Sequence, residues 1–280
     1  MLAQTNADWE VVLVDDGSDD DTAVQAQHWQ HKLGERFQYV YQSNQGVSSA
    51  RNHGLAVAQG YRLVFLDADD ELKPTALADY DLHANEAWII GGFEIERDGK
   101  IKTRIPALPQ SRQQRFADYM EKKFHIGNIS NMCFQADVFD EMRFAEELRV
   151  GEDLALFALL FTRIDPRVLS DITAQAHRRF DSLRTRSSAE ALAGSRLPQI
   201  IFEHPLLDAR YKPYARAYLA RRGRSIMKKA YREGRYDQAV SWYEFMLKNK
   251  PGLIFNLKLL VRYLKSRLKL RTARLTKAPL

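Results

Sequence analysis

Short apolar segments alternate with more polar, helix-type segments along the first part of the chain. The β-branched and apolar runs 10–14 and 37–41 predict two strands. Residues 20–33 between them predict a helix, whose acidic start suits the positive end of the helix dipole. A glycine turn then leads into a short helix that ends near Gly60, and the apolar run 63–66 predicts a third strand. This order predicts a βαβαβ unit with a parallel sheet.

The same reading predicts the remaining elements. These are a helix from Pro74 to about Asn85, strands 88–96 and 101–105 joined by a hairpin turn, a helix near 116–124, a strand at 129–134, helices 136–142 and 154–161, a strand at 168–176, and helices 214–232, 236–248 and 253–270. From residue 205 onward every predicted element is helical. We therefore expect an α/β domain at residues 1–204 and a helical extension at residues 205–280.

Charge separates the same two parts of the chain. Residues 205–280 contain 20 Lys/Arg and 4 Asp/Glu, a net charge of +16, whereas residues 1–204 contain 22 basic and 32 acidic side chains, a net charge of −10. Hydrophobic residues make up 45% of the 280, enough for a sizeable core. With no secretory leader, no membrane-length apolar run and one cysteine, Cys133, a cytoplasmic location is the expectation.

Four carboxylates follow the predicted strand 63–66 within five positions. They belong to Asp67, Asp69, Asp70 and Glu71. Like charges this close repel one another, and a divalent cation bound to phosphate oxygens would relieve the repulsion. Asp67 and Asp69, at i and i+2, are the candidate ligands of Mg²⁺ or Mn²⁺, while Asp70 and Glu71 turn outward or cap the next helix. The alternative is that all four merely solubilise a strand-to-helix turn.

A second acidic pair ends the first predicted strand. In parallel sheets, ligands bind outside the carboxyl ends of the strands, where Asp15 and Asp16 lie. A buried carboxylate there can accept hydrogen bonds from a base N–H or from ribose hydroxyls. Arg51, in the intervening turn and helix, is the candidate cation for a diphosphate. Helix capping is the alternative role of Asp16 and Ser18.

Three motifs resemble those of a known family. Val-Val-Leu-Val-Asp-Asp-Gly-Ser at 11–18, Gly-Val-Ser-Ser-Ala-Arg-Asn-His-Gly-Leu at 46–55 and Val-Phe-Leu-Asp-Ala-Asp-Asp at 64–70 are similar, in order and spacing, to the signatures of glycosyltransferase family 2. The resemblance implies an α/β GT-A fold, a Rossmann-like three-layer structure with a mostly parallel central sheet. It also implies a nucleotide-sugar donor and inversion at the anomeric carbon.

The resemblance also shows a departure. Family members begin with another strand and helix, so this chain is expected to lack the first strand and part of the first helix. By the family's strand order, the absent strand would lie between the strands at 10–14 and 62–66. Its loss should leave unpaired strand edges or force these two strands together, which puts the activity of the truncated chain in doubt.

Further along, Gly151-Glu152-Asp153 precedes an apolar helix. Acids at a helix amino terminus are explained by the dipole alone. The resemblance instead implies that Asp153 is the general base that deprotonates the acceptor and that Glu152 orients the acceptor or the loop. The segment from His177 to Arg184 resembles one that closes over the diphosphate, with His177 as a metal or phosphate contact. The alternative for His177 is a strand-end side chain facing solvent.

The last predicted helix is amphipathic and basic. One stripe contains Leu253, Leu257, Leu260, Leu264 and Leu268, and another contains Lys258, Arg262, Lys265 and Lys269. This pattern suits an anionic membrane surface, and the alternative is an ordinary packed helix with a solvated basic face. Nucleic acid is not expected as a partner, because the acidic domain would repel it and no nucleic-acid-binding motif occurs.

Together these features predict an inverting hexosyl- or N-acetylhexosaminyltransferase. We expect a UDP-sugar donor, a glycan or lipid-linked oligosaccharide acceptor, and Mg²⁺ or Mn²⁺, in bacterial surface polysaccharide synthesis. The expected location is cytoplasmic, with peripheral attachment to the inner face of the cell membrane. The alternative is an inactive fragment whose basic helical part binds a partner or a membrane surface.

Overall fold

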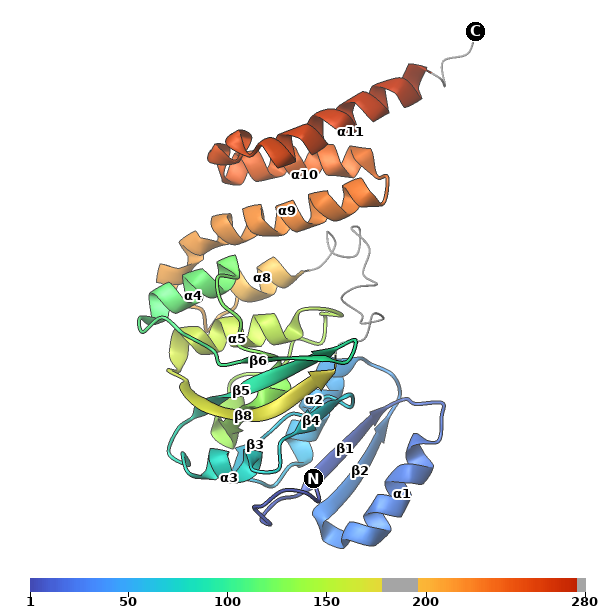
Figure 1. Cartoon of the computed structure of the whole chain (residues 1–280), viewed down its shortest axis with the longest axis vertical. Helices are drawn as coiled ribbons and strands as arrows, with labels where there is room; N and C mark the ends of the chain where they lie inside the picture. Colours follow the sequence, from blue (N-terminus) through green and yellow to red (C-terminus); the bar gives the residue numbers. More distant parts are fainter. Residues whose placement is uncertain (178–195, 276–280) are drawn as a thin grey trace. The chain divides into compact units, whose positions relative to one another are not determined.

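The chain forms two compact units. The computed structural model describes residues 1–177 and 196–275, with side chains through residue 272. The first unit comprises Met1–Phe116 with Lys123–Phe180, and the second comprises Ala117–Lys122 with Asp181–Leu280. All strands described below belong to the first unit, and the long helices near the carboxyl terminus belong to the second (Figure 1).

A small parallel sheet opens the first unit. Strands β1 (Val11–Asp16) and β2 (Phe37–Gln42) pair in parallel, and helix α1 (Thr22–Leu33) connects them. Helix α2 (Val47–Val57) follows and packs against β1, where Gly54 lies beside Val14. The strands and helices predicted for residues 10–57 are thus confirmed.

A second sheet of six strands has the order β3-β7-β5-β8-β4, with β6 paired to β5. Its strands are β3 (Arg62–Leu63), β4 (Asp70–Leu72), β5 (Trp88–Arg97), β6 (Lys100–Arg104), β7 (Met132–Gln135) and β8 (Arg167–His177). Only β5 and β8 pair in parallel, and the other pairs are antiparallel. The α/β class is confirmed, but this sheet is mixed rather than mostly parallel.

The strand predicted at 63–66 is much shorter than expected. β3 ends at Leu63 and pairs only with β7, and β1 pairs only with β2. The two strands therefore keep one unpaired edge each and are not forced together. Residues 64–66 have no regular secondary structure.

The acids that follow also differ from expectation. Asp70 and Glu71 neither turn outward together nor cap a helix, because they lie in β4 and pair with Ala176 and Gln175 of β8. This pairing draws Asp70 toward the interior of the unit and leaves Glu71 exposed. The acidic segment is therefore held at one end by the sheet.

Helices cover both faces of the six-stranded sheet. The helices between its strands are α3 (Ala76–Asp81), α4 (Arg112–Glu121) and α5 (Glu152–Arg163). Successive residues of a strand point to opposite faces. Trp88 of β5 packs on Phe161 of α5, with 4.9 Å between ring centroids, whereas Ile89 packs in a cluster with Tyr80 of α3. Helix α5 thus packs on one face of the sheet and α3 on the other.

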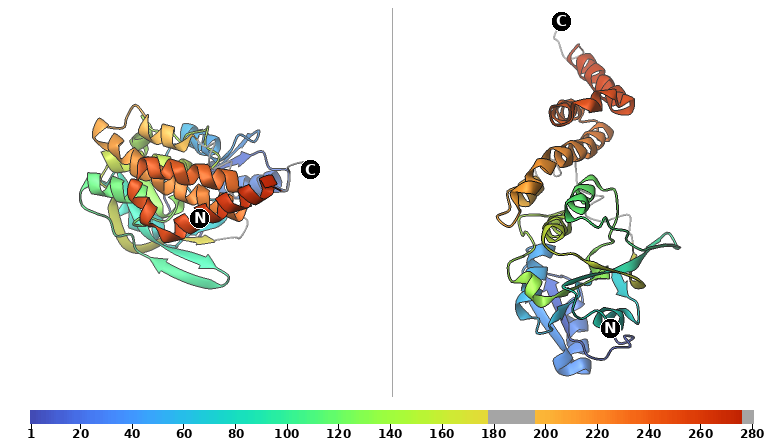
Figure 2. Two further views of the ribbon diagram at one scale, coloured as in Figure 1. Left: turned by 90° about the horizontal axis from the view of Figure 1, so that it is seen from above. Right: turned by 90° about the vertical axis from the view of Figure 1, so that its left-hand side faces the viewer.

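The second unit is built from helices. They are α8 (Leu197–Phe202), α9 (Ala215–Arg232), α10 (Tyr236–Asn249) and α11 (Leu257–Leu275). Figure 2 shows α9, α10 and α11 stacked one against the next. Gly223 allows α9 and α10 to approach closely, since a Cβ atom there would lie 2.7 Å from Cγ of Met246. The core of this unit includes Ile226, Tyr243 and Leu259.

Gly91 tests the close contact between β5 and β8. A Cβ atom at this position would lie 2.0 Å from Oγ1 of the buried Thr173. Gly91→Ala should therefore lower the free energy of unfolding by about 1–3 kcal/mol, because the overpacked sheet must shift. Gly54→Ala is the matched control, because its Cβ atom would lie 3.5 Å from Cγ2 of Val14, an ordinary contact, within a helix. Denaturant unfolding measures both, and equal stabilities would contradict this packing.

Candidate active site

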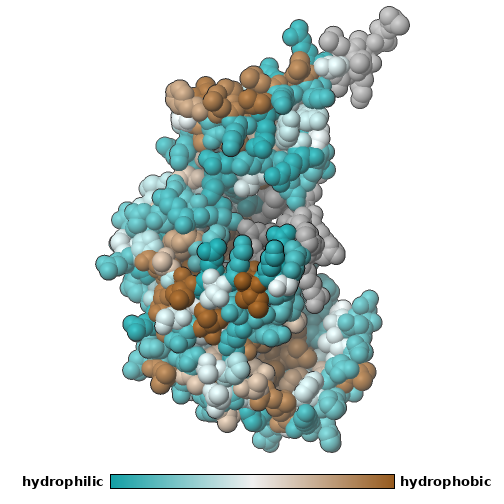
Figure 3. Space-filling view, viewed as in Figure 1, coloured by the Kyte–Doolittle hydropathy of each residue, from teal (hydrophilic) through white to brown (hydrophobic). Residues whose placement is uncertain are grey.

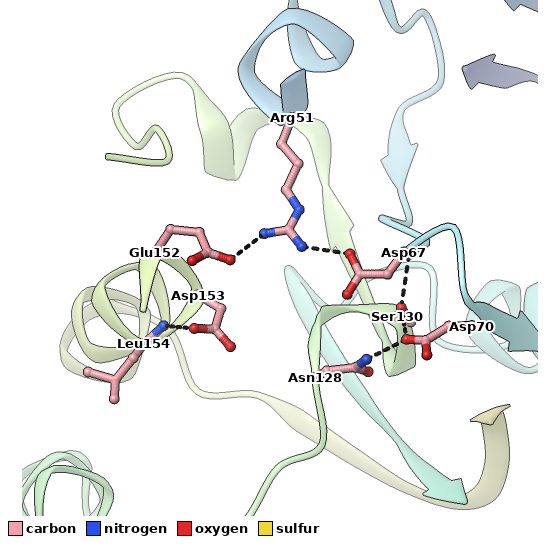
Figure 4. Close-up of polar contacts among 8 residues, drawn as sticks. All are labelled: Arg51, Asp67, Asp70, Asn128, Ser130, Glu152, Asp153 and Leu154. Atoms are coloured by element: carbon pink, nitrogen blue, oxygen red, sulfur yellow. Dashed lines mark hydrogen bonds and ion pairs between the residues drawn. The ribbon is translucent and has the colours of Figure 1, made fainter. Parts of the chain in front are cut away.

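Arg51 lies at the centre of a cluster of carboxylates. Helix α2 carries Arg51, whose Nη2 lies 2.6 Å from Oδ1 of Asp67 and whose Nη1 lies 3.0 Å from Oε1 of Glu152 (Figure 4). The Arg51 side chain is only 11% exposed. One mostly buried guanidinium therefore joins the acidic segment after β3 to the first turn of α5, where Glu152 lies 101 residues after Arg51 in the sequence.

The charges in this cluster depend on one another. Burial opposes the charge of Arg51, but the carboxylates of Asp67 and Glu152 outweigh it and raise the pKa of the guanidinium. Burial and the neighbouring Asp153 raise the pKa of Glu152, and Arg51 opposes both effects. Arg51 is thus the counter-ion that allows two carboxylates to be placed together here.

Asp153 occupies the amino terminus of α5 beside Glu152. Its Oδ1 accepts a hydrogen bond of 2.6 Å from the backbone N–H of Leu154 (Figure 4). Gly151 precedes the helix with φ of 91°, a left-handed conformation that glycine adopts without strain. The glycine thereby sets the direction from which the chain enters the helix and presents the two acids.

Hydrogen bonds to the carboxylate of Asp70 hold the acidic segment in place. Its carboxylate accepts hydrogen bonds from Nδ2 of Asn128 and from Oγ of Ser130 at 2.7 Å (Figure 4). It also accepts one from the backbone N–H of His177 at 3.3 Å. Burial raises the pKa of Asp70, although the bonds from Ser130 and Asn128 counteract it. Sequence reasoning assigned no role to Asn128 or Ser130. Both precede β7, and no local pattern marks them.

The acidic segment suits a divalent cation only if a substrate supplies most of the ligands. Within residues 1–177 and 196–275, no group of three His, Cys, Asp or Glu side chains could hold a metal ion. Asp69 is exposed, and Asp67 is partly exposed with one oxygen directed at Arg51. Two carboxylates with phosphate oxygens and water are a common donor set for Mg²⁺. The residues present therefore fit a cation that arrives with a diphosphate.

Asp15 and Asp16 fasten the carboxyl end of β1. Asp15 is buried and accepts hydrogen bonds from the Tyr39 hydroxyl at 2.7 Å and from the Ser18 N–H at 2.8 Å. These bonds lower the pKa of Asp15, and the same contact raises the pKa of Tyr39 to about 12.

The carboxylate of Asp16 contacts the start of helix α2. Its two carboxylate oxygens accept backbone N–H groups of Gln45 and Gly46, each at 2.8 Å, at the start of α2. Burial opposes these bonds, but they prevail and lower the pKa of Asp16. Helix α1 begins instead after Asp21, which makes no side-chain cap hydrogen bond, so neither Asp16 nor Ser18 caps it. The carboxylate of Asp16 thus positions the helix that carries Arg51.

His177 ends β8 between two glutamates. Its Nδ1 lies 3.3 Å from Oε2 of Glu96, and its Nε2 lies 3.5 Å from Oε1 of Glu71. The side chain is 29% exposed, so it is neither fully solvated nor deeply buried. Residues 178–184, the rest of the segment expected to close over a diphosphate, lie outside the described residues. Of the predicted site residues, Arg51, Asp67, Glu152 and Asp153 are gathered in one cluster, and His177 borders the acidic strand β4.

The architecture is similar to that of a solved GT-A glycosyltransferase. The structure of S. aureus TarS 1-349 in complex with UDP-GlcNAc matches with a TM-score of 0.55 and 16% sequence identity, covering 97% of this chain and 85% of that one. At this identity the likeness concerns the fold, which is the GT-A fold that the sequence motifs predict.

A family model matches the amino-terminal part of the chain. The sequence model of Glycosyl transferase family 2 matches residues 1–137. This match includes the three motifs at 11–18, 46–55 and 64–70, and it confirms their resemblance to glycosyltransferase family 2.

The matches to two curated relatives cover more of the chain than residues 1–137. The GalNAc(5)-diNAcBac-PP-undecaprenol beta-1,3-glucosyltransferase of Campylobacter jejuni is 31% identical over 160 residues, covering 55% of this chain and 50% of that protein. The minor teichoic acid biosynthesis protein GgaB of Bacillus subtilis is 29% identical over 164 residues, covering 55% of this chain and 18% of that protein. The chain spans half or less of the length of these relatives.

Tyr39→Phe tests the hydrogen bond that holds Asp15. Because the bond lowers the pKa of Asp15, its stabilisation is complete above the ordinary carboxyl value of 3.8 and disappears as the pH falls through the lower, folded-state value. The variant should therefore unfold at a lower denaturant concentration than the wild type at pH 7, and the difference should shrink in acid. Tyr41→Phe, at an exposed neighbouring position, is the control. A deficit that is independent of pH would contradict this role of Tyr39.

Proposed function

We propose that the protein transfers a hexosyl or N-acetylhexosaminyl group from a UDP-sugar to a hydroxyl acceptor, with inversion at the anomeric carbon. The observation that carries this proposal is the pair of contacts made by Arg51, which hold Asp67 of the acidic segment and Glu152, the neighbour of Asp153, against one side chain. An inverting transferase needs both: a place for the departing diphosphate and a base for the acceptor. The match to the family 2 model and the transferase relatives support the same reaction class.

On the donor side, Asp67 and Asp69 would hold Mg²⁺ or Mn²⁺ together with the diphosphate. Such a cation supplies charge neutralisation to the departing nucleoside diphosphate. Asp15 and Asp16 lie at the carboxyl end of β1, where a nucleoside would contact the sheet edge. UDP as the nucleotide is supported by the UDP-GlcNAc complex of TarS, which shares the fold.

On the acceptor side, Asp153 is the proposed general base. The Leu154 N–H holds its Oδ1, so the other oxygen is available to take the acceptor proton. The acceptor oxygen then bonds to the anomeric carbon as the bond from that carbon to the diphosphate breaks, and a single displacement inverts the configuration. Glu152, held by Arg51, orients the acceptor or the loop.

The names of two relatives support a class of acceptor. The name of the C. jejuni relative specifies an undecaprenol-linked acceptor, and that of the B. subtilis relative specifies teichoic acid biosynthesis. We therefore propose a glycan or lipid-linked oligosaccharide acceptor in bacterial surface polysaccharide synthesis. A lipid-linked acceptor would require peripheral attachment of the protein to the inner face of the cell membrane.

The donor half is tested by calorimetry. The wild type should bind UDP in the presence of Mg²⁺ or Mn²⁺ and much more weakly without either cation. Asp69→Asn should weaken this cation-dependent binding, because it removes one of two proposed carboxylate ligands, whereas Asp140→Asn, at an exposed position, should not. Absence of UDP binding by the wild type would favour the alternative, an inactive chain whose basic helices bind a partner or a membrane.

The acceptor half is tested by Asp153→Asn. This variant should lose about 100-fold or more in transfer rate, the usual contribution of a general base, while UDP binding changes little. The rate is measured as UDP release in the presence of the acceptor, and binding is measured by calorimetry. If Asp153→Asn abolishes UDP binding instead, Asp153 belongs to the donor site and is not the base.

A further inference from the structure

Helix α11 carries an exposed apolar row that the transferase chemistry does not use. The row consists of Leu257, Val261, Leu264 and Leu268, with Ile254 and Phe255 just before the helix. Phe255 is 85% exposed and Leu257 is 73% exposed. In Figure 3 the brown surface along α11 is this row. It gathers six of the 14 exposed large hydrophobic side chains in the described residues within 15 positions.

The side chains of this row are not part of the core of the second unit. The buried side of α11 carries Leu259 and Ser266, which are almost fully inaccessible. At about 100° per residue, the exposed row lies on roughly the opposite side of the helix. The stripe predicted from sequence is partly wrong, because Leu253 is buried and Leu260 packs against the core. Val261 takes their place in the exposed row.

Basic side chains run beside the row. They belong to Lys258, Arg262, Lys265 and Lys269, within about 140° of it around the helix. Lys228 of α9 lies near two of them: burial lowers its pKa, and nearby cations that include Arg262 and Lys258 lower it further. With a net charge of +16 over residues 205–280, this surface attracts anions.

The charge beside the row indicates which kind of partner binds to it. A second copy of the chain would bring two basic flanks together, which repel. Among the described residues, no helix has the length and apolar content to cross a membrane, so insertion across a bilayer does not account for the row. A bilayer that contains anionic lipid satisfies both features, because apolar side chains enter the acyl boundary while lysines and arginines contact the headgroups.

We propose that the exposed row of α11, with its basic flank, is a docking surface for an anionic lipid bilayer. The helix lies in the plane of the interface with Leu257, Leu264 and Leu268 directed into it. The biological purpose of this surface rests on the proposed function. If the acceptor is lipid-linked, the surface brings the transferase to the membrane that contains it.

Vesicle co-sedimentation of the full chain tests the surface without any donor or acceptor. The wild type should bind vesicles of phosphatidylcholine with phosphatidylglycerol, bind pure phosphatidylcholine far more weakly, and lose affinity as salt is raised. The triple variant L257Q/L264Q/L268Q should lose at least about tenfold in affinity. Its matched control, V24Q/L82Q/I105Q, replaces three equally exposed apolar residues of the first unit and should bind as the wild type does.

A charge variant, K258Q/K265Q/K269Q, separates the two contributions. It should weaken binding to the anionic vesicles and flatten the salt dependence, with unchanged circular dichroism. Equal vesicle binding by the wild type and the α11 apolar variant would overturn the proposal. A wild type that is dimeric by sedimentation velocity, becomes monomeric in L257Q/L264Q/L268Q and ignores vesicles would also overturn it, in favour of a second copy.

Calorimetry with UDP on the same variants separates this inference from the proposed function. Vesicle binding without UDP binding would refute the transferase and leave the docking surface intact. UDP binding by a chain that ignores vesicles would refute the docking surface alone.

Discussion

The site depends on a buried cation between two carboxylates that the sequence keeps far apart. Arg51 contacts Asp67 on one side and Glu152 on the other, and its side chain is mostly shielded from solvent. Removing one partner from a buried ion pair leaves an uncompensated charge, which is strongly destabilising. The position of α2 therefore fixes how the acidic segment and the start of α5 face each other. Asp16 in turn fixes the start of α2 through the N–H groups of Gln45 and Gly46.

What the sequence could predict was local. The strand and helix patterns of residues 10–57 and the hairpin after residue 88 were recovered, because each rests on neighbouring side chains. The length of β3 and the strand at Asp70–Leu72 were not, since a strand exists only where a partner supplies hydrogen bonds. The anchoring of Asp70 by Asn128 and Ser130 joins segments about 60 residues apart and leaves no local trace.

The exposed side of helix α11 could not be predicted from the sequence either. Periodicity identified an apolar stripe, but a helix that is apolar on two sides does not reveal which side is buried. The structure resolves this: Leu259 packs inward, and Leu257 with Leu264 remains exposed beside lysines. The first unit thus brings carboxylates from distant segments together, and the second unit carries an exposed apolar row beside basic side chains.

A double-mutant cycle between Arg51 and Glu152 tests the central claim most directly. Arg51→Met alone should lower the free energy of unfolding by about 1–3 kcal/mol, because it leaves the mostly buried Glu152 carboxylate without a partner, whereas water screens the partly exposed Asp67. Combined with Glu152→Gln, the loss should be smaller than the sum of the single losses by at least about 1 kcal/mol, since the orphaned charge is removed. Additive losses, within about 0.5 kcal/mol, would show that the two side chains act independently and would contradict a single site built on Arg51.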